Sequence, residues 1–129
     1  AVHVGLADRV LLDAPCSGLG VIRQKPDIRY NRTEANITEL SVLQSNLIKS
    51  AAVIVKPSGR LVYSVCTMEK EETTDVIHRF LAENTDFAVV EPPAILQGRI
   101  SDDGYGYAFW PHRDLVDGFY VAMLQRKGI

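Results

Sequence analysis

The chain has 129 residues, of which 47% are hydrophobic and 23% charged, and its formal net charge is −2. These values are ordinary for one soluble globular domain, and they exclude a global positive field that would attract nucleic acid. No apolar run approaches the roughly 20 residues that span a bilayer.

The beginning of the chain has neither an initiator Met nor the basic region of a signal peptide. A strand is predicted within its first dozen residues. We therefore expect residues 1–129 to be one part of a longer polypeptide. Two cysteines without a signal peptide are typical of a reduced cytoplasmic protein, and they are too few for a structural zinc site.

The first half of the chain predicts a strand, a long loop and a helix. Residues 9–13 form a short apolar run that ends at Asp-Ala-Pro, which indicates a buried strand. Residues 14–32 are rich in Pro, Gly and charge, and a loop of this length is typical of a functional segment. Apolar residues then recur at steps of three and four, which predicts a helix over 34–55 that Pro-Ser-Gly at 57–59 ends.

The second half predicts strands over 60–66, 86–91 and 119–124, and a helix over 69–82. Residues 94–117 have no clear pattern but contain several aromatic side chains, for which core packing and base stacking are both open. Helices and strands that alternate in this way indicate an α/β fold.

Both cysteines follow a predicted strand. Cys16 comes three residues after the end of strand 9–13, and Cys66 ends strand 60–66. A right-handed crossover makes these strands parallel neighbours, so their carboxyl ends meet at one edge of the sheet. Ligands of open α/β sheets bind at that edge, and we expect Asp13, Cys16 and Cys66 to lie together there.

A thiol in a cleft can act as a nucleophile when a base or a positive environment activates it. Asp13 is the nearest carboxylate, and Pro15 fixes the backbone before Cys16. The alternatives for the two thiols are a structural disulfide or inert packing in the core. Basic residues in the following loop are candidates for phosphate contacts or simply form a solvated surface. They include Arg23, Lys25 and Arg29.

Several blocks of this sequence resemble one family. Residues 13–18, Asp-Ala-Pro-Cys-Ser-Gly, are similar to motif IV of the Sun (Fmu) family of RNA cytosine-C5 methyltransferases. Further similar blocks follow in the same order: Leu43-Gln44, residues 56–67, Glu71-Glu72, Pro111-His112 and Asp117-Gly118-Phe119-Tyr120. The resemblance covers nearly all of residues 8–126.

The resemblance implies the C-terminal half of a Rossmann-like class I methyltransferase fold, a mostly parallel sheet with an antiparallel last strand. It implies that Cys66 attacks C6 of cytosine, that Cys16 assists breakdown of the covalent adduct, and that Asp13 lies at the cytosine and the cofactor. The implied cofactor is S-adenosylmethionine, with Asp13 and Pro15 as its contacts in this chain. Arg23, Lys25, Arg29 and His112 are candidate RNA contacts, and no metal is implied.

The Gly-rich cofactor loop of the family precedes motif IV, and nothing in residues 1–129 resembles it. We therefore expect this polypeptide alone to bind S-adenosylmethionine weakly and to be inactive. The strand at 9–13 also lacks the neighbour that it has in the family, which predicts that it pairs with a missing N-terminal half or associates with itself.

Ribosomal RNA is the expected substrate, and transfer RNA is the alternative. Two other functions compete with this interpretation. In DNA cytosine-C5 methyltransferases the Pro-Cys cysteine is the nucleophile, and the second cysteine is not needed. A non-catalytic module that binds RNA or a partner would need neither thiol.

Overall fold

The computed structural model describes residues 5–16, 34–67, 69–91, 105–109 and 118–128. The described helices all fall between the first strand and the third. The elements are β1 (Ala7–Asp13), α2 (Glu34–Ile54), β2 (Val55–Val65), the 3-10 turn η2 (Lys70–Glu72), α3 (Thr74–Glu83), β3 (Phe87–Val89), β4 (Tyr107–Phe109) and β5 (Phe119–Arg126).

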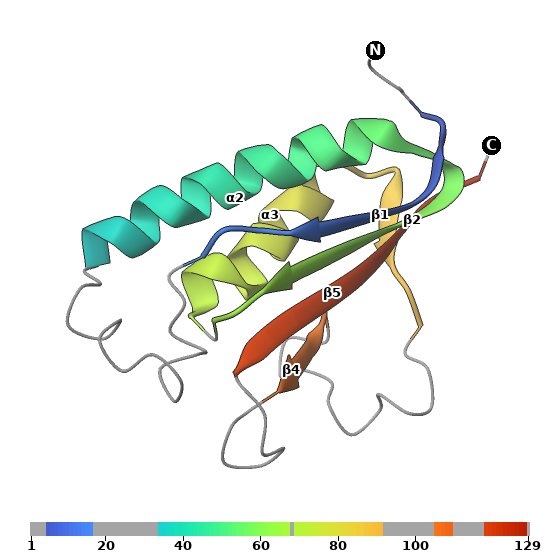
Figure 1. The fold of residues 1–129 in the computed structure, drawn as a ribbon. Coiled ribbons are helices and arrows are strands. Elements are labelled where there is room, and N and C mark those ends of the chain that lie inside the picture. Colours follow the sequence, from blue (N-terminus) through green and yellow to red (C-terminus); the bar gives the residue numbers. More distant parts are fainter. Residues whose placement is uncertain (1–4, 17–33, 68, 92–104, 110–117, 129) are drawn as a thin grey trace.

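A five-stranded sheet organises these elements in the order β1-β2-β5-β3, with β4 also paired to β5. β1 and β2 are parallel, whereas β5 runs antiparallel to β2, β3 and β4. The first four strands therefore share one direction, and β5 has the opposite one (Figure 1). The predicted α/β class, the parallel first pair and the antiparallel last strand are confirmed.

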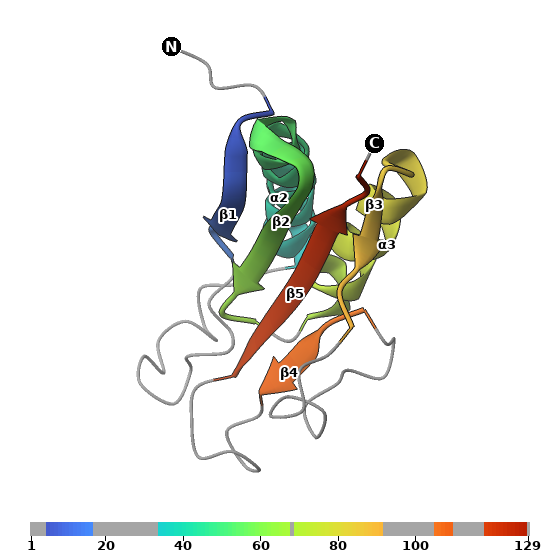
Figure 2. The same cartoon turned by 90° about the vertical axis from the view of Figure 1, so that its right-hand side faces the viewer.

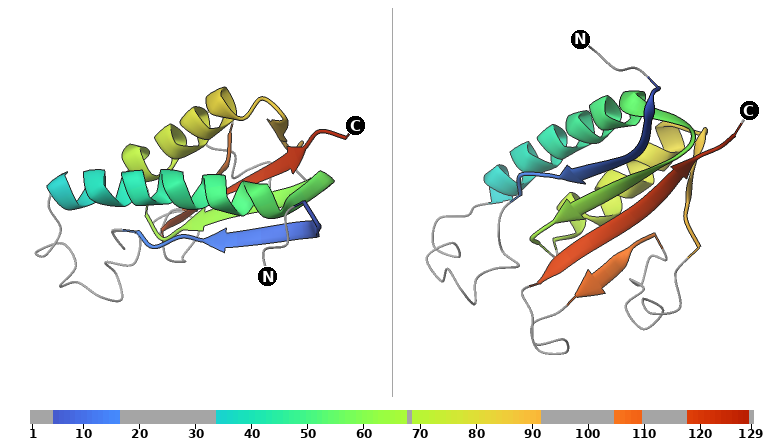
Figure 3. Two further views of the ribbon diagram at one scale, coloured as in Figure 1. Left: turned by 90° about the horizontal axis from the view of Figure 1, so that it is seen from above. Right: turned by 45° about the vertical axis from the view of Figure 1, so that its right-hand side comes forward.

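Both helices lie on the same face of the sheet (Figures 2 and 3). β2 alternates between buried and half-buried side chains, because every second residue points toward the helices. The core contains Ile48, Ala51, Ala52, Val55, Leu61, Tyr63, Val65, Val76, Ile77, Phe80, Tyr120, Ala122 and Leu124. None of the described helices is long and apolar enough to cross a membrane.

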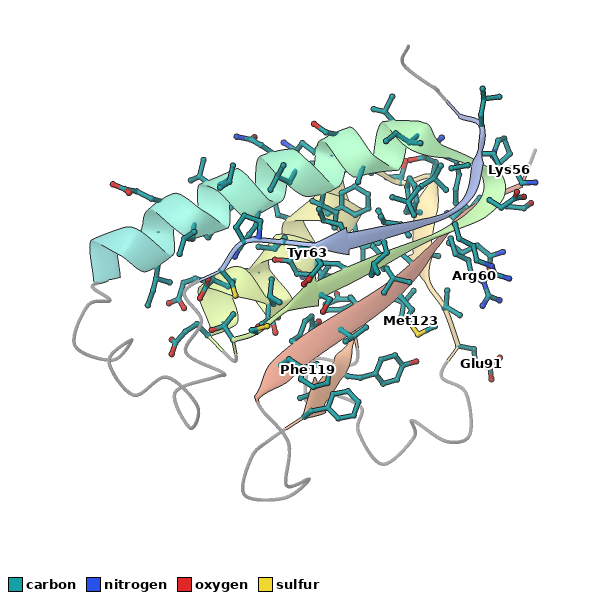
Figure 4. All side chains as sticks on the ribbon, viewed as in Figure 1. Lys56, Arg60, Tyr63, Glu91, Phe119 and Met123 are labelled. Carbon is teal, nitrogen blue, oxygen red and sulfur yellow. The ribbon has the colours of Figure 1, made fainter. Side chains whose placement is uncertain are left out.

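The other face of the sheet carries no helix in the described part of the chain (Figure 2). Leu11, Val62 and Met123 form one row across this face, since they are register partners on β1, β2 and β5 (Figure 4). Leu11 is 70% exposed. β1 is also the edge strand of the described sheet, so an apolar row reaches an open edge.

β2 begins directly after α2, at Val55, and not at Arg60 as predicted. The register with β1 passes from Ala7↔Val55 to Arg9↔Arg60, so the intervening residues of β2 form a bulge. Ser58 has a φ of 69° within this bulge. The Pro-Ser-Gly segment was expected to separate helix from strand, but pairing with β1 on both sides makes it part of the strand.

The helix predicted over 69–82 is divided into η2 and α3. Thr73 interrupts it with φ −119° and ψ −92°. The hydroxyl of Tyr63 donates a hydrogen bond of 2.8 Å to the backbone oxygen of Glu72. That bond ties the end of η2 to β2, next to the residue at which the predicted helix is divided.

β4 was missed within the segment 94–117, for which no regular structure was predicted. It is three residues long, and its sequence is too short to show an alternating pattern. Gly106 lies before it, where a Cβ atom would lie 2.7 Å from the Val121 oxygen and closer still to the Tyr120 ring. β3 is likewise shorter than the predicted strand 86–91.

Candidate active site

The carboxyl ends of β1 and β2 bring the two cysteine segments together. Asp13 is the last residue of β1 and pairs with Ser64, and the Ala14 N–H donates to the Ser64 oxygen at 2.9 Å. The backbone N–H of Cys66 donates a hydrogen bond to the Cys16 sulfur at 3.3 Å. The predicted meeting of both cysteines at one sheet edge is therefore present in the structure.

Neither cysteine forms a disulfide, and both side chains are half-buried. The disulfide alternative therefore has no support in this structure. A backbone N–H that donates to sulfur stabilises negative charge on it, which is the form that reacts as a nucleophile or accepts a proton. Within the described residues, the Cys16 sulfur is therefore held by a backbone donor of the Cys66 segment at this edge of the sheet.

The Cys16 loop is anchored on the core side and open on the solvent side. Ala14 is buried in the core, whereas Asp13 and Pro15 are exposed. The backbone oxygen of Pro15 accepts a 2.8 Å hydrogen bond from the side chain of Gln44 on α2. The loop therefore presents the Asp13 carboxylate outward while its backbone is held from inside.

The segment after Cys66 is shaped by hydroxyl side chains. Thr67 is fully buried, and its Oγ1 accepts a 3.2 Å hydrogen bond from the Glu69 N–H. The Thr73 hydroxyl donates to the Glu69 oxygen at 3.0 Å. These bonds fold the chain tightly from the end of β2 into η2.

A buried polar cluster lies behind the cysteines. Gln44 and Glu72 are both 0% exposed, and Gln44 Nε2 donates to Glu72 Oε1 at 3.1 Å. Burial raises the pKa of Tyr63, and the nearby charges of Glu72 and Cys16 raise it further, so its hydroxyl stays protonated and donates. These residues belong to blocks that resemble the family, but the resemblance assigned them no task. A glutamine between Leu40 and Leu47 on an apolar helix face is a usable signal for a buried polar contact.

Aromatic side chains lie at the same edge, beside the start of β5. Phe109 and Phe119 stack with ring centroids 4.5 Å apart and planes 19° apart (Figure 4). Tyr107 is buried, which favours the packing interpretation for that residue. Burial also raises the pKa of its hydroxyl.

The candidate RNA contacts Arg23, Lys25, Arg29 and His112 lie outside the described residues. Their role in RNA binding therefore stays a prediction. Asp13, Pro15, Cys16 and Cys66 are the predicted site residues that the structure does place, all at one edge.

The carboxyl group of Glu69, three residues after Cys66, predicts that the stability of the fold depends on pH. Burial raises its pKa, and the charges of Glu71 and Glu72 raise it further. Ionisation of Glu69 therefore disfavours the folded state, with a penalty that is absent below the ordinary pKa of 4.5 and develops as the pH rises to the elevated folded-state value. We expect Glu69→Gln to stabilise the complete protein at pH 7 by up to about 0.5 kcal/mol, with no gain at pH 3.5.

Urea unfolding between pH 3.5 and pH 7 measures the difference in unfolding free energy between Glu69→Gln and the unmodified protein. Glu91→Gln is the matched control, because it makes the same substitution at an exposed residue two positions after β3. A gain for Glu69→Gln that is largest in acid would contradict the expected sign.

Comparisons with known proteins agree with this geometry. The crystal structure of PH0851 superposes with a TM-score of 0.87 and 38% identity, over 95% of this chain and 27% of that chain. The structure of NSun6 from Pyrococcus horikoshii with SFG gives a TM-score of 0.79 and 31% identity, over 94% of this chain and 30% of that one. The sheet and these neighbours define the fold as that of the class I methyltransferases.

The profile of the family described as 16S rRNA methyltransferase RsmB/F matches residues 2–125. The chain belongs to this family. It is 39% identical over 127 residues to the probable ribosomal RNA small subunit methyltransferase B of Bacillus subtilis. That alignment covers 94% of this chain and 28% of the relative, so the chain spans just over a quarter of the relative's length.

Proposed function

We propose that this chain supplies the catalytic half of an S-adenosylmethionine-dependent methyltransferase that modifies C5 of cytosine in RNA. The observation that carries the proposal is the Cys16 sulfur held 3.3 Å from the Cys66 backbone nitrogen, at the ligand-binding edge of the sheet. Family membership supports it, because the matching profile is described as a 16S rRNA methyltransferase.

The two thiols have unequal tasks in the proposed reaction. Cys66 attacks C6 of the cytosine, and the electrons of the C5–C6 double bond move to C5, which becomes nucleophilic. S-adenosylmethionine, when bound, supplies the methyl group to C5. Cys16 then assists the loss of the C5 proton as the bond between Cys66 and C6 breaks, which restores both the aromatic ring and the free thiolate.

Asp13 is the residue of this chain best placed to contact both the cytosine and the cofactor. Its carboxylate is exposed at the carboxyl end of β1, one residue from Ala14, which is held in the core. A carboxylate there can stabilise a protonated cytosine ring during attack. The exposed ring of Pro15 fits one wall of a cofactor site, while the described residues offer no Gly-rich phosphate-type loop to complete it.

A base stacked within paired RNA cannot reach this edge, so the substrate cytosine must be unpaired or flipped. We take ribosomal RNA as the substrate, and the ribosomal names of the matching relatives support this choice. Arg23, Lys25, Arg29 and His112 are the proposed RNA contacts. Both thiols must stay reduced for the reaction, which favours the cytoplasm as the compartment.

The test uses the complete protein, S-adenosylmethionine with a labelled methyl group, and unmodified 16S ribosomal RNA or transfer RNA. Label should appear as 5-methylcytosine in the ribosomal RNA digest, as measured by mass spectrometry. Label in transfer RNA alone would replace the substrate assignment. Absence of 5-methylcytosine from both RNAs would remove the enzyme proposal and favour a binding module.

The isolated chain is expected to be a poor enzyme. Because the proposed cofactor loop belongs to the N-terminal half, titration calorimetry should give S-adenosylmethionine a dissociation constant at least about 100-fold higher for residues 1–129 than for the complete protein. The same isolated chain should transfer no methyl group to RNA. Robust methyl transfer by these 129 residues would refute the proposal that the N-terminal half supplies the cofactor loop.

The edge strand β1 is the proposed contact with the N-terminal half, or with a second copy when that half is absent. The side of β1 that faces away from β2 has no partner strand in the described sheet, so its backbone groups offer hydrogen bonds and Leu11 offers apolar surface. Light scattering of the isolated chain should therefore give a mass above the 14.3 kDa of a monomer. Leu11→Lys should shift the mass toward the monomer.

Val42→Lys is the matched control, since Val42 is an apolar side chain that is 52% exposed but belongs to α2 and not to β1. It should leave the association unchanged. A monodisperse monomer for the unmodified chain would count against this role of β1.

A further inference from the structure

Gln44 is a buried amide on a helix face that otherwise packs as core. It is 0% exposed, and the apolar positions Ile48 and Ala51 follow on the same helix. Burial of an amide costs free energy unless it makes hydrogen bonds. The question is therefore what its hydrogen bonds hold.

Both donated bonds of Gln44 go to segments that carry the cysteines. Nε2 donates to the Pro15 oxygen at 2.8 Å and to Glu72 Oε1 at 3.1 Å. Both partners are acceptors, which fixes the orientation of the amide group. Its own Oε1 has no hydrogen-bond partner in the described part of the chain. The two donated hydrogen bonds, to Pro15 and Glu72, are therefore the ones that determine the orientation of the Gln44 amide.

The bond to Pro15 restrains Cys16 directly. The Pro15 oxygen belongs to the peptide unit that leads into Cys16, so its position sets the plane from which the Cys16 side chain leaves. On its other side, the Cys16 sulfur accepts the Cys66 N–H at 3.3 Å. Cys16 is therefore held at its backbone by α2 and at its sulfur by the end of β2.

The bond to Glu72 connects Gln44 to β2, the strand that leads into Cys66. Glu72 is 0% exposed, and its backbone oxygen accepts the Tyr63 hydroxyl at 2.8 Å. Tyr63 lies on β2, three residues before Cys66. Three hydrogen bonds therefore connect the Cys16 segment, through Gln44 and Glu72, to Tyr63 on β2. Because β2 leads into Cys66, the two thiols are held by the same set of buried contacts.

We propose that Gln44 is a positioning residue that holds Cys16 in register with Cys66 for breakdown of the covalent adduct. This inference rests on the proposed function. Gln44 touches neither the RNA nor the cofactor in this scheme and acts only through Pro15 and Glu72. Loss of its amide should therefore slow the step served by Cys16 more than the attack by Cys66.

The test replaces Gln44 with Met in the complete protein, which keeps the length of the side chain and removes both donors. The covalent complex with substrate RNA should form at close to the unmodified rate. It should break down about 10- to 100-fold more slowly, because a small misplacement of a reacting group costs a factor of this order. Gln125→Met is the matched control, since Gln125 Nε2 also donates to a backbone oxygen, that of Ser58 at 3.1 Å. It should leave both rates unchanged.

A merely structural role predicts a different result. Adduct formation and breakdown would then fall together with the melting temperature, and no complex would accumulate. That result would overturn the proposal. Should Gln44→Met fail to fold, Gln44→Asn keeps an amide on a side chain that is one methylene shorter. It should slow adduct breakdown, but by less than the factor expected for Gln44→Met.

Thiol alkylation separates this proposal from the proposed function. Iodoacetamide labelling followed by peptide mass spectrometry gives the rate at each cysteine without RNA. The ratio of the Cys16 rate to the Cys66 rate should change several-fold in Gln44→Met and stay constant in Gln125→Met. An unchanged ratio refutes the positioning role, whereas a changed ratio with no RNA adduct in the unmodified protein refutes only the methyltransferase reaction.

Discussion

Cys66→Ala is expected to abolish the covalent complex with RNA that contains 5-fluorocytosine, whereas Cys16→Ala is expected to retain it. Fluorine at C5 cannot leave as a proton would, so a protein that attacks C6 remains bound to the RNA. Loss of the attacking thiol should also lower turnover by at least about 10³-fold. Denaturing electrophoresis of the complete protein with labelled RNA measures the complex.

The two variants control for each other, because the cysteines lie in one site and both are half-buried. Each substitution removes one sulfur from the same sheet edge. The opposite pattern, with the complex lost in Cys16→Ala, would assign attack to the Pro-Cys cysteine as in DNA cytosine-C5 methyltransferases. It would replace the proposed mechanism.

Phe80→Ala is expected to lower the free energy of unfolding by about 3–5 kcal/mol, the usual cost of removing a buried aromatic ring. Phe80 is 1% exposed on α3. It meets Phe87 of β3 edge-on, with ring centroids 5.2 Å apart. The substitution therefore leaves a cavity between the helical layer and the sheet, which chemical denaturation of the complete protein measures.

Phe109→Ala is the comparison for this variant. Phe109 also contacts another phenylalanine ring, but it is only partly buried. Its loss should cost about 1–2 kcal/mol, because less apolar surface returns to water. Equal losses for the two variants would show that α3 is not docked on the core as the structure has it.

The meeting of the two cysteines could be predicted because it depends on topology. A parallel pair of strands joined by a helix has its carboxyl ends at one edge, whatever side chains the strands carry. The sequence of residues 9–13 and 60–66 was sufficient to recognise both strands. The observed bond between Cys66 and the Cys16 sulfur follows from that arrangement.

The buried contacts among Gln44, Glu72 and Tyr63 could not be predicted in the same way. Glu72 follows three other charged residues, Glu69, Lys70 and Glu71. Such a run is normally solvated, yet Glu72 is fully buried. Its burial depends on Gln44, which is distant in sequence and meets it only in the folded state. The division of the predicted helix at Thr73 lies beside another contact of this kind, since the Tyr63 hydroxyl of β2 donates to the Glu72 carbonyl.

The place of β5 has a consequence for how the protein folds during synthesis. β5 follows β2, β3 and β4 in the chain, yet it pairs with all three. Until residues 119–126 have left the ribosome, β2 lacks its second neighbour and the apolar side chains of the core have no complete cover. Contacts such as Arg60↔Gln125 close a long loop, so assembly of the sheet is a late and slow event. The nascent chain must therefore keep its incomplete sheet from pairing with other chains until β5 is available.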